Sequence, residues 1–358
     1  MTLPQPVRYQ ADLEEIQPDE QQVISDLNDT FDTILTRTAE DYGHAVRSVH
    51  AKSHGILEGT LEVEGDLAPE FAQGLFAAPA SYKIYMRLST NAGDILPDAI
   101  SLPRGLAMKV VGVNGERIEG AEGTTQDFVM VNGPVFQTPD AKKFQGNLKM
   151  LAKTTDRLEG TKKVVSSVLQ TVNSALEAVG IESSAVQSLG GAPNSDPLGE
   201  TYFSVTPFRY GDYVAKFRLK PVSQGLVELT GREIDASVSD DAIRETVQAE
   251  MRDTAGEWLL QVQLCRDLEK QPIEDPTVEW KEDEAPFTTV ARIKAGPQDS
   301  WSEANVQKVN EEMRFSVWTG LAAHRPLGNI NRARKDTYEH SSQFRATFNG
   351  CPMHEPTA

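Results

Sequence analysis

The stretch "GNINRARKDTYEHSSQFR", residues 328–345, is polar and basic, although it lies close to the end of an acidic chain. Its composition is typical of a helix, and four of its side chains recur at helical spacing. Counted from Arg334, Tyr338 follows after four residues, Ser341 after seven and Arg345 after eleven. Residues at these intervals lie on one face of an α-helix, so the pattern predicts a stripe of Arg, Tyr, Ser and Arg.

This stripe has the chemistry of a site. A guanidinium one turn from a phenol favours the charged phenolate, which is a hard anionic ligand suited to ferric iron. Arg345 can pair with a carboxylate in fork geometry. The alternative is a solvated helix with surface arginines. The apolar turn "LAAHRPLG" (321–328) directly before the stripe favours a helix whose start is buried.

The bulk composition excludes several classes of function. Asp and Glu number 53 against 35 Lys and Arg, a net charge of −18 that repels nucleic acid and anionic membranes. Only Cys265 and Cys351 are present, which is too few for a disulfide framework and fits a reducing compartment. The N-terminal residues form no apolar leader, and no apolar run reaches membrane-spanning length. We therefore expect a cytoplasmic location.

Alternating apolar residues outside this stretch predict a sheet. In "EWLLQVQLC", Trp258, Leu260, Val262 and Leu264 fall on one strand face. About eight such runs predict an α+β fold, an eight-stranded antiparallel β-barrel with inserted and appended helices. The expected strands are 56–63, 82–90, 105–113, 127–136, 201–208, 212–221, 257–267 and 287–295. The expected helices are about 18–37, 141–188, 240–254 and 329–348, with 187–200 as a loop.

The chain shows no internal repeat and no domain-separating linker. We expect an N-terminal arm and helix over residues 1–40 and one barrel domain with its C-terminal helix over 41–348. Residues 349–358 are expected to be a tail without fixed structure.

The segment "VWTGLAAHRPLGNINRARKDTY" (317–338) resembles the proximal-helix region of the haem catalase superfamily. The resemblance is strongest to the short catalase-related proteins, which are catalase-like peroxidases. Further motifs follow in the family's order over about residues 40–348. They are "RSVHAKSHG" (47–55), "YMRLSTNAGD" (85–94), "LPRGLAMKV" (102–110), "DFVMVNGPVF" (127–136), "DPLGETYFSVTPFRYGDYVAKF" (196–217) and "APFTTVARIKAGPQ" (285–298).

The resemblance implies ferric haem b between the barrel and the last helix. Tyr338, with Arg334 one turn before it, is then the axial ligand of the iron, as tyrosine is in catalases. Arg47, Arg87 and Arg345 match the arginines that hold the haem propionates. An arginine buried inside a barrel needs a partner, and a propionate would supply one.

On the other side of the haem, the resemblance implies that His50 moves a proton between the two peroxide oxygens. Strict strand alternation would put Arg47 and His50 on opposite faces, so a bulge or an irregular strand start is expected here. The remaining matches are Ser89 to orient His50, Asn132 to polarise the peroxide, Val49 beside His50, and Phe136 and Phe144 to line the haem.

The family implies a peroxidase or catalase-type oxidoreductase that cleaves the O–O bond of hydrogen peroxide or organic hydroperoxides. Asn91 and Leu102 depart from the classical access channel, so lipid hydroperoxides remain open as substrates. A fatty acid hydroperoxide isomerase, lyase or allene oxide synthase-like dehydrase is one alternative, and a non-catalytic haem-binding barrel is another. We expect no NADPH, because the C-terminal region that binds it in some catalases is missing. A small-molecule reductant and a homo-oligomer are left open.

Overall fold

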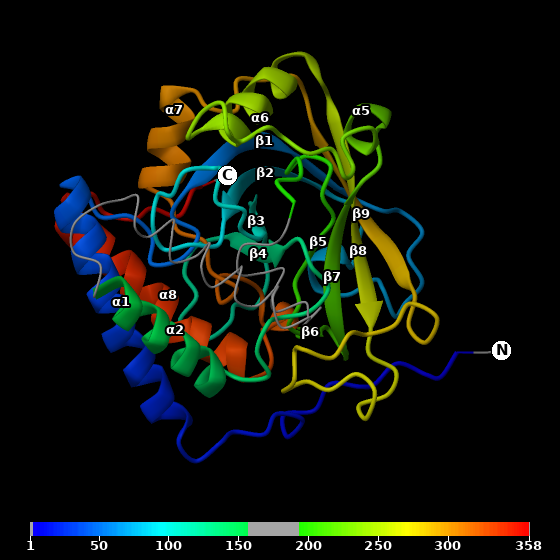
Figure 1. Ribbon diagram of the computed structural model, residues 1–358. Coiled ribbons are helices and arrows are strands. Elements are labelled where there is room, and N and C mark those ends of the chain that lie inside the picture. The colour runs from blue at the N-terminus through cyan, green and yellow to red at the C-terminus, as the bar shows by residue number, and fades with distance from the viewer. Residues whose placement is uncertain (1–2, 157–192, 358) are drawn as a thin grey trace, which may run out of the picture.

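A closed antiparallel β-barrel forms the centre of the molecule (Figure 1). The computed structural model describes residues 3–156 and 193–357. Among these residues eight strands pair in a circuit, β1-β2-β3-β4-β5-β7-β8-β9 and back to β1, while β6 pairs with β7 alone. This confirms the predicted eight-stranded barrel. The strands are β1 (Ser53–Val63), β2 (Ser81–Thr90), β3 (Arg104–Val111), β4 (Thr125–Val131), β5 (Tyr202–Phe203), β6 (Phe208–Tyr210), β7 (Tyr213–Pro221), β8 (Gly256–Leu264) and β9 (Phe287–Ala295).

Two predicted strands are shorter or broken in the structure. β5 and β6 pair with successive parts of β7 and are interrupted near Val205, whose φ of 54° is left-handed. The predicted strand 127–136 ends at Val131. Pro134 has no N–H to continue a ladder, and the residues before it turn away. The predictions of unbroken strands over 201–208 and 127–136 were therefore wrong in extent.

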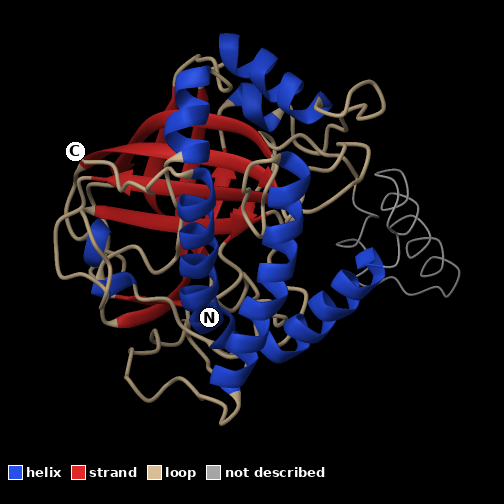
Figure 2. Cartoon of the chain, turned by 90° about the vertical axis from the view of Figure 1, so that its left-hand side faces the viewer, coloured by secondary structure: helices blue, strands red, loops and turns tan. Residues whose placement is uncertain are grey.

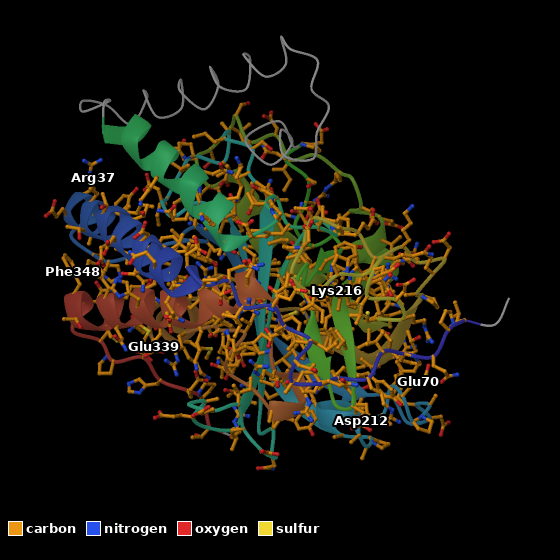
Figure 3. All side chains as sticks on the ribbon, turned by 90° about the horizontal axis from the view of Figure 1, so that it is seen from below. Arg37, Glu70, Asp212, Lys216, Glu339 and Phe348 are labelled. Atoms are coloured by element: carbon orange, nitrogen blue, oxygen red, sulfur yellow. The ribbon has the colours of Figure 1, made fainter. Side chains whose placement is uncertain are left out.

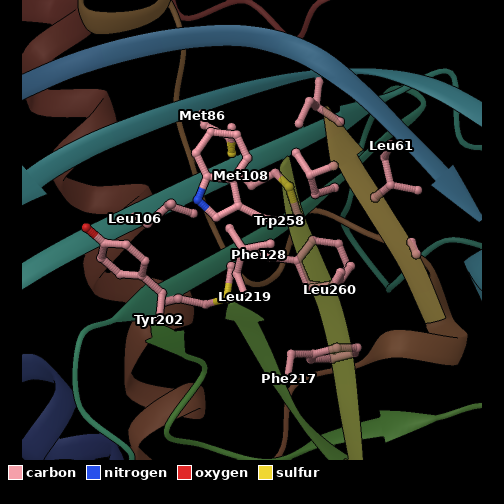
Figure 4. Packing of buried hydrophobic residues seen from close by; sticks show 14 of the residues in the cluster. Leu61, Met86, Leu106, Met108, Phe128, Tyr202, Phe217, Leu219, Trp258 and Leu260 are labelled. Atoms are coloured by element: carbon pink, nitrogen blue, oxygen red, sulfur yellow. The ribbon is translucent and has the colours of Figure 1, made fainter. Parts of the chain in front are cut away.

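The barrel interior holds the main hydrophobic core (Figure 4). The β8 residues predicted to share a face all belong to it, and Leu260 packs there with Met86, Met108 and Phe128. Side chains of alternate residues point inward, so the intervening ones face outward. Each large apolar side chain buried in this way stabilises the fold by roughly 1.5–3 kcal/mol.

Three helices cover one side of the barrel and pack on one another (Figures 1 and 2). They are α1 (Glu20–Tyr42), α2 (Ala141–Asp156) and α8 (Asn329–Asn349). Gly350, at φ 63°, ends α8 in the left-handed conformation that glycine adopts most easily. The part of the predicted helix beyond residue 156, and the start of the predicted loop at 187, lie outside the described residues.

The other helices are short or lie at the far end of the barrel. No described helix is both long and apolar enough to cross a membrane. The elements are η1 (Gly74–Phe76), α5 (Gln224–Val227), α6 (Ala242–Asp253), α7 (Glu303–Asn305), the π-helical η3 (Val306–Glu311) and η4 (Ala322–His324).

Both ends of the chain are tied to the barrel. The predicted N-terminal arm is extended around Val7, which donates its N–H to the Cys265 carbonyl at 2.8 Å. The tail has no helix or strand, as expected. It nevertheless has a fixed position, which was not expected. Its Glu355 pairs with the fully buried Lys109 at 2.7 Å and accepts a hydrogen bond from Thr125. Lys109 also pairs with the buried Asp127 at 2.8 Å, so the two carboxylates share one ammonium, and this contact fixes the tail.

His324 is a buried histidine that should make the fold sensitive to acid. Its Nε2 accepts a hydrogen bond from the Leu75 N–H at 2.9 Å, and aromatic rings surround it. Burial lowers the pKa of His324 to about 3 from its ordinary 6.5. The unfolded chain binds this proton near pH 6.5 and the folded chain does not, so stability is full above pH 6.5 and falls towards pH 3.

We expect the melting temperature to drop steeply between pH 6.5 and pH 4, measured by circular dichroism. In His324→Gln the melting temperature at pH 7.5 should be lower and its dependence on pH shallower. An unchanged pH dependence in the variant would show that His324 does not carry this effect.

Candidate functional site

A cavity lies between the outer face of the barrel and α8. Its walls come from residues 47–50, from β2, β3 and β4, from residues 314–315 and from α8. Most of the predicted site residues meet here, although they come from segments far apart in the chain. The described lining includes Arg47, Val49, His50, Arg87, Ser89, Tyr338, Ser341 and Arg345.

Arg87 lies on the outer face of β2. It pairs in register with Ala107 of β3, which pairs with Val129 of β4, and all three line the cavity. Their neighbours Met86, Met108 and Phe128 point into the core. The sequence suggested that Arg87 lies inside the barrel. This prediction was wrong, because the side chain lies on the outside. It is buried against the outer wall by η3, where its Nε donates to Asn310 Oδ1 at 3.0 Å.

The segment before β1 has the irregular start that the sequence predicted. β1 begins only at Ser53, and His50 has a left-handed φ of 53°. Arg87 fixes this backbone by donating to the carbonyls of His50, at 2.9 Å, and Ala51, at 3.0 Å. This conformation lets Arg47 and His50 line the same cavity.

Three guanidinium groups, those of Arg47, Arg87 and Arg345, line the cavity without an acidic partner. Arg47 and Arg345 both donate to the Asn310 carbonyl, at 2.8 and 2.9 Å. In the described part of the chain none of the three forms an ion pair, and the buried Arg345 Nε has no hydrogen-bond partner. Burial, reinforced by Arg345, lowers the pKa of Arg87 to about 9. Glu311, whose charge acts on all three arginines, is paired with His44 at 2.8 Å. The cluster therefore has an excess of positive charge, which two carboxylates would offset.

The His50 ring is held by Ser89. Its Nδ1 lies 3.0 Å from Ser89 Oγ, and Ser89 Oγ donates to the Gly105 carbonyl at 3.4 Å. Both contacts are satisfied together when Nδ1–H donates to Ser89 and Ser89 donates to Gly105, and this arrangement leaves the free lone pair on Nε2. Burial, with Arg87, Arg334 and Arg47 adding to it, lowers the pKa of His50 to about 3. At neutral pH the imidazole is uncharged and can act as a base.

Gly105 leaves the space in which the His50 ring lies. A Cβ at this position would lie 2.4 Å from His50 Nδ1 and Cε1, and 3.1 Å from Ser89 Oγ. No carbon can approach that closely, so the residue on β3 must be glycine for the ring to keep this orientation.

We expect Gly105→Ala to push the His50 ring away from Ser89 and to lower, by about tenfold to a hundredfold, the peroxide turnover that the sequence resemblance implies. Haem content should stay close to that of the wild type, because the added methyl group is small and Gly105 is not among the residues that line the cavity. Steady-state kinetics with haem quantified per chain would check this. Gly133→Ala is the control, since a Cβ there meets nothing within 4 Å. Equal turnover in Gly105→Ala and the wild type would contradict the role of Gly105.

Tyr338 and Ser341 are the residues of the predicted stripe that, with Arg345, line the cavity from α8. Ser341 Oγ accepts a hydrogen bond from Ser48 N at 3.2 Å, which joins the helix to the segment carrying His50. Arg334 belongs to the predicted stripe but is not among the residues that line the cavity. Its Nη1 donates to Asn331 Oδ1 at 3.1 Å, and its guanidinium lies 5.8 Å from the Phe136 ring centre.

Three other predicted residues lie beside the cavity rather than in its wall. The Asn132 amide oxygen accepts a hydrogen bond from Arg104 N at 2.9 Å, and Val129 supplies the β4 part of the wall. Phe136 and Phe144, with ring centres 5.8 Å apart, pack with Val49 in a cluster between α1, α2 and α8.

Sequence reasoning missed Asn310, Arg314 and Phe315. Asn310 serves all three unpaired arginines, through its side chain or its carbonyl. Arg314 and Phe315 line the cavity, and Arg314 Nε contacts Glu355 of the tail at 3.4 Å. The only sequence signal was their position just before the quoted stretch at 317.

The donor set fits haem better than a bare metal ion. No group of three or more His, Cys, Asp or Glu side chains in the described residues is placed to hold a metal. The cavity instead offers one phenol oxygen, one neutral imidazole, apolar walls and the unpaired arginines. A flat apolar ring system that brings its own metal and two carboxylates would use each of these features.

The comparisons with known proteins identify the family and the fold. A family model described as Catalase matches residues 10–308, and no protein with a curated description matches significantly. Catalase A from Saccharomyces cerevisiae is 16% identical with a TM-score of 0.61, covering 98% of this chain and 69% of that one. A fungal catalase is 18% identical with a TM-score of 0.60, covering 89% and 65%. A bacterial catalase is 16% identical with a TM-score of 0.59, covering 98% and 66%.

At such identities the likeness to solved structures is one of fold. The chain spans about two thirds of the length of these three proteins. The family match ends at residue 308, before α8, so it does not include Tyr338.

Proposed function

The chain belongs to the catalase family of haem oxidoreductases, and on that premise we propose that it binds haem b beneath α8 and processes peroxides there. The observation that carries this proposal is the cluster of Arg47, Arg87 and Arg345. Arg87 and Arg345 are buried and Arg47 is half-buried. All three line the same cavity as a neutral histidine and a tyrosine, and in the described residues none forms an ion pair with an acid.

Each wall of the cavity has a part in holding the haem. Arg47, Arg87 and Arg345 would pair with its two carboxylates, which would supply the missing negative charge. Tyr338 would provide a phenolate oxygen as the iron ligand, the role that tyrosine has in catalases. Leu106 and Phe315 would contact the apolar ring and keep water from it.

The bound haem would supply the redox chemistry of O–O bond cleavage, and the protein residues would control the proton. His50 Nε2 would take the proton from one peroxide oxygen and deliver it to the other, which then leaves as water or an alcohol. Ser89 holds the ring for this transfer through Nδ1, and Gly105 leaves room for it. The lowered pKa of His50 keeps the base uncharged at neutral pH.

The proposed substrates are hydrogen peroxide and organic hydroperoxides. Measuring the activity with each of them would show which one the protein uses. Haem-loaded protein would be given hydrogen peroxide under an oxygen electrode, and cumene hydroperoxide with guaiacol in a photometer. Oxygen release indicates catalase activity, and guaiacol oxidation indicates peroxidase activity. Consumption of a fatty acid hydroperoxide with no reductant would favour an isomerase or dehydrase. Rates no higher than those of free hemin with every substrate would overturn the proposal.

A further inference from the structure

A second cavity opens on the outer face of β7, β8 and β9. Phe203, Phe287 and Trp280 give it aromatic walls, and Gln263 and Lys216 are polar groups in it. Lys216 and Gln263 are partners in the β7–β8 register, so they share this outer face. Figure 3 labels Lys216 near the middle of the molecule, beside strands drawn in green. None of these residues lines the first cavity.

Lys216 is the unusual group in this cavity. Its side chain is buried, with 4% of the residue exposed, and its Nζ has no hydrogen-bond partner. The amine lies 4.7 Å from the centre of the Trp280 ring. Among the described residues no carboxylate comes within ion-pair distance of it, and Glu282 on the same wall is already paired with Arg218 at 2.5 Å. The face of the Trp280 ring attracts the ammonium form, but burial with no hydrogen bond and no carboxylate within ion-pair distance disfavours the charge and lowers the pKa of the amine.

The other titratable groups near Lys216 only partly offset the effect of burial on its pKa. Burial lowers its pKa to about 8, while Cys265, Asp275 and Glu279 act in the opposite direction. Burial raises the pKa of Cys265 to about 12, so its thiol is protonated at neutral pH. A substantial fraction of Lys216 is therefore an uncharged nucleophile near pH 8.

The cavity wall also contains strained backbone. Val205 has a φ of 54°, which is rare for a residue branched at Cβ. The flanking Ser204 and Thr206 fix it through hydrogen bonds between their hydroxyls and each other's carbonyls, at 3.0 and 3.1 Å. Strain of this kind persists where the surroundings enforce it and is concentrated at binding sites. His50, in the first cavity, is the other described non-glycine residue with positive φ.

We propose that this second cavity binds aldehydes or ketones with an apolar or aromatic body, and that Lys216 Nζ holds them as an imine. The carboxylates of Glu279 and Glu282 on its wall disfavour an anionic ligand, whereas a neutral carbonyl compound meets no such repulsion. The aromatic side chains can pack against the apolar part of the ligand, and Lys216 Nζ can bond to its carbonyl carbon. This inference does not depend on the proposed function of the first cavity.

The bond changes balance without an oxidant or a reductant. The Nζ lone pair forms a bond to the carbonyl carbon while the C=O π pair moves to oxygen. The oxygen gains a proton and the nitrogen loses one, which gives a carbinolamine. Loss of the hydroxyl group with a second proton releases water and leaves the imine, and hydrolysis reverses the sequence.

The test is reductive trapping on the full-length haem-loaded protein. Benzaldehyde and sodium cyanoborohydride would be added over short times between pH 6.5 and 9, and labelled lysines located by peptide mass spectrometry. Lys220, exposed and four residues further along β7, is the internal control. We expect Lys216 to be labelled at least about tenfold faster than Lys220 at pH 8, with a rate that levels off above that pH.

Variants keep this test separate from the first cavity. Lys216→Met should lose the fast-labelled peptide and Lys220→Met should retain it, while both keep wild-type haem absorbance and peroxide turnover. Labelling of Lys216 no faster than that of Lys220 in the wild-type protein would overturn the proposal, and this result needs no variant to fold. A failure to bind haem would overturn only the proposed function.

Discussion

Replacing His50 by glutamine is expected to lower kcat/KM for hydrogen peroxide by about a thousandfold, while haem content stays unchanged. Glutamine has a similar size and can still hydrogen bond, but it cannot take up a proton. His50 Nδ1 is held by Ser89 at 3.0 Å, so in the proposed mechanism the other nitrogen alone performs the transfer. The loss therefore measures the proton transfer and not the packing of the ring.

Two accompanying measurements sharpen this result. Ser89→Ala should cost less than His50→Gln, because it frees the ring without removing the base. Haem absorbance per chain must be measured for each variant, since Arg87 donates to the His50 carbonyl and a disturbed backbone could affect haem binding. If haem-replete His50→Gln retains more than a tenth of wild-type turnover, His50 is not the proton carrier.

Replacing Tyr338 by phenylalanine is expected to weaken haem binding by at least about a hundredfold and to change the absorption spectrum of any haem that remains. Only one oxygen atom is removed, and the aromatic ring still fills its part of the cavity wall. In the proposed site that oxygen is the iron ligand, so its loss should abolish the phenolate-to-iron charge-transfer band.

The matched control for this variant is Tyr213→Phe on β7. That tyrosine lies outside the cavity, where the Arg8 guanidinium is 5.5 Å from its ring centre. Its haem spectrum and affinity should equal those of the wild type. Unaltered haem affinity and an unaltered spectrum in Tyr338→Phe would mean that another group binds the iron.

The barrel could be predicted from the sequence because alternation is a local signal. Trp258 and Leu260 share the core face as their spacing predicted. Alternation does not say which face points inward, so Arg87 was expected inside the barrel and lies outside it. The break near Val205 was also missed, because nothing in "TYFSVTPF" marks a left-handed valine.

The site was predicted in part. The motifs brought His50, Ser89, Arg87 and Tyr338 to one cavity, each from its own segment. Asn310 could not be found in this way, because its contact with Arg87 spans 223 residues of sequence and depends on how η3 packs on the barrel.

Asn132 shows a second limit of sequence reasoning. Motif order placed it near the site, but β4 ends one residue earlier, and its amide oxygen turns to the Arg104 backbone. The tail contact between Glu355 and Lys109, 246 residues apart, likewise has no local signal.

The most direct measurement is a titration of the purified protein with hemin, followed by its absorption spectrum from the near ultraviolet to the red. We predict saturation at one haem per chain, a Soret band, and the charge-transfer bands of ferric haem bound by a phenolate. Protein that stays colourless in excess hemin, or a spectrum identical to that of free hemin, would contradict a haem site beneath α8.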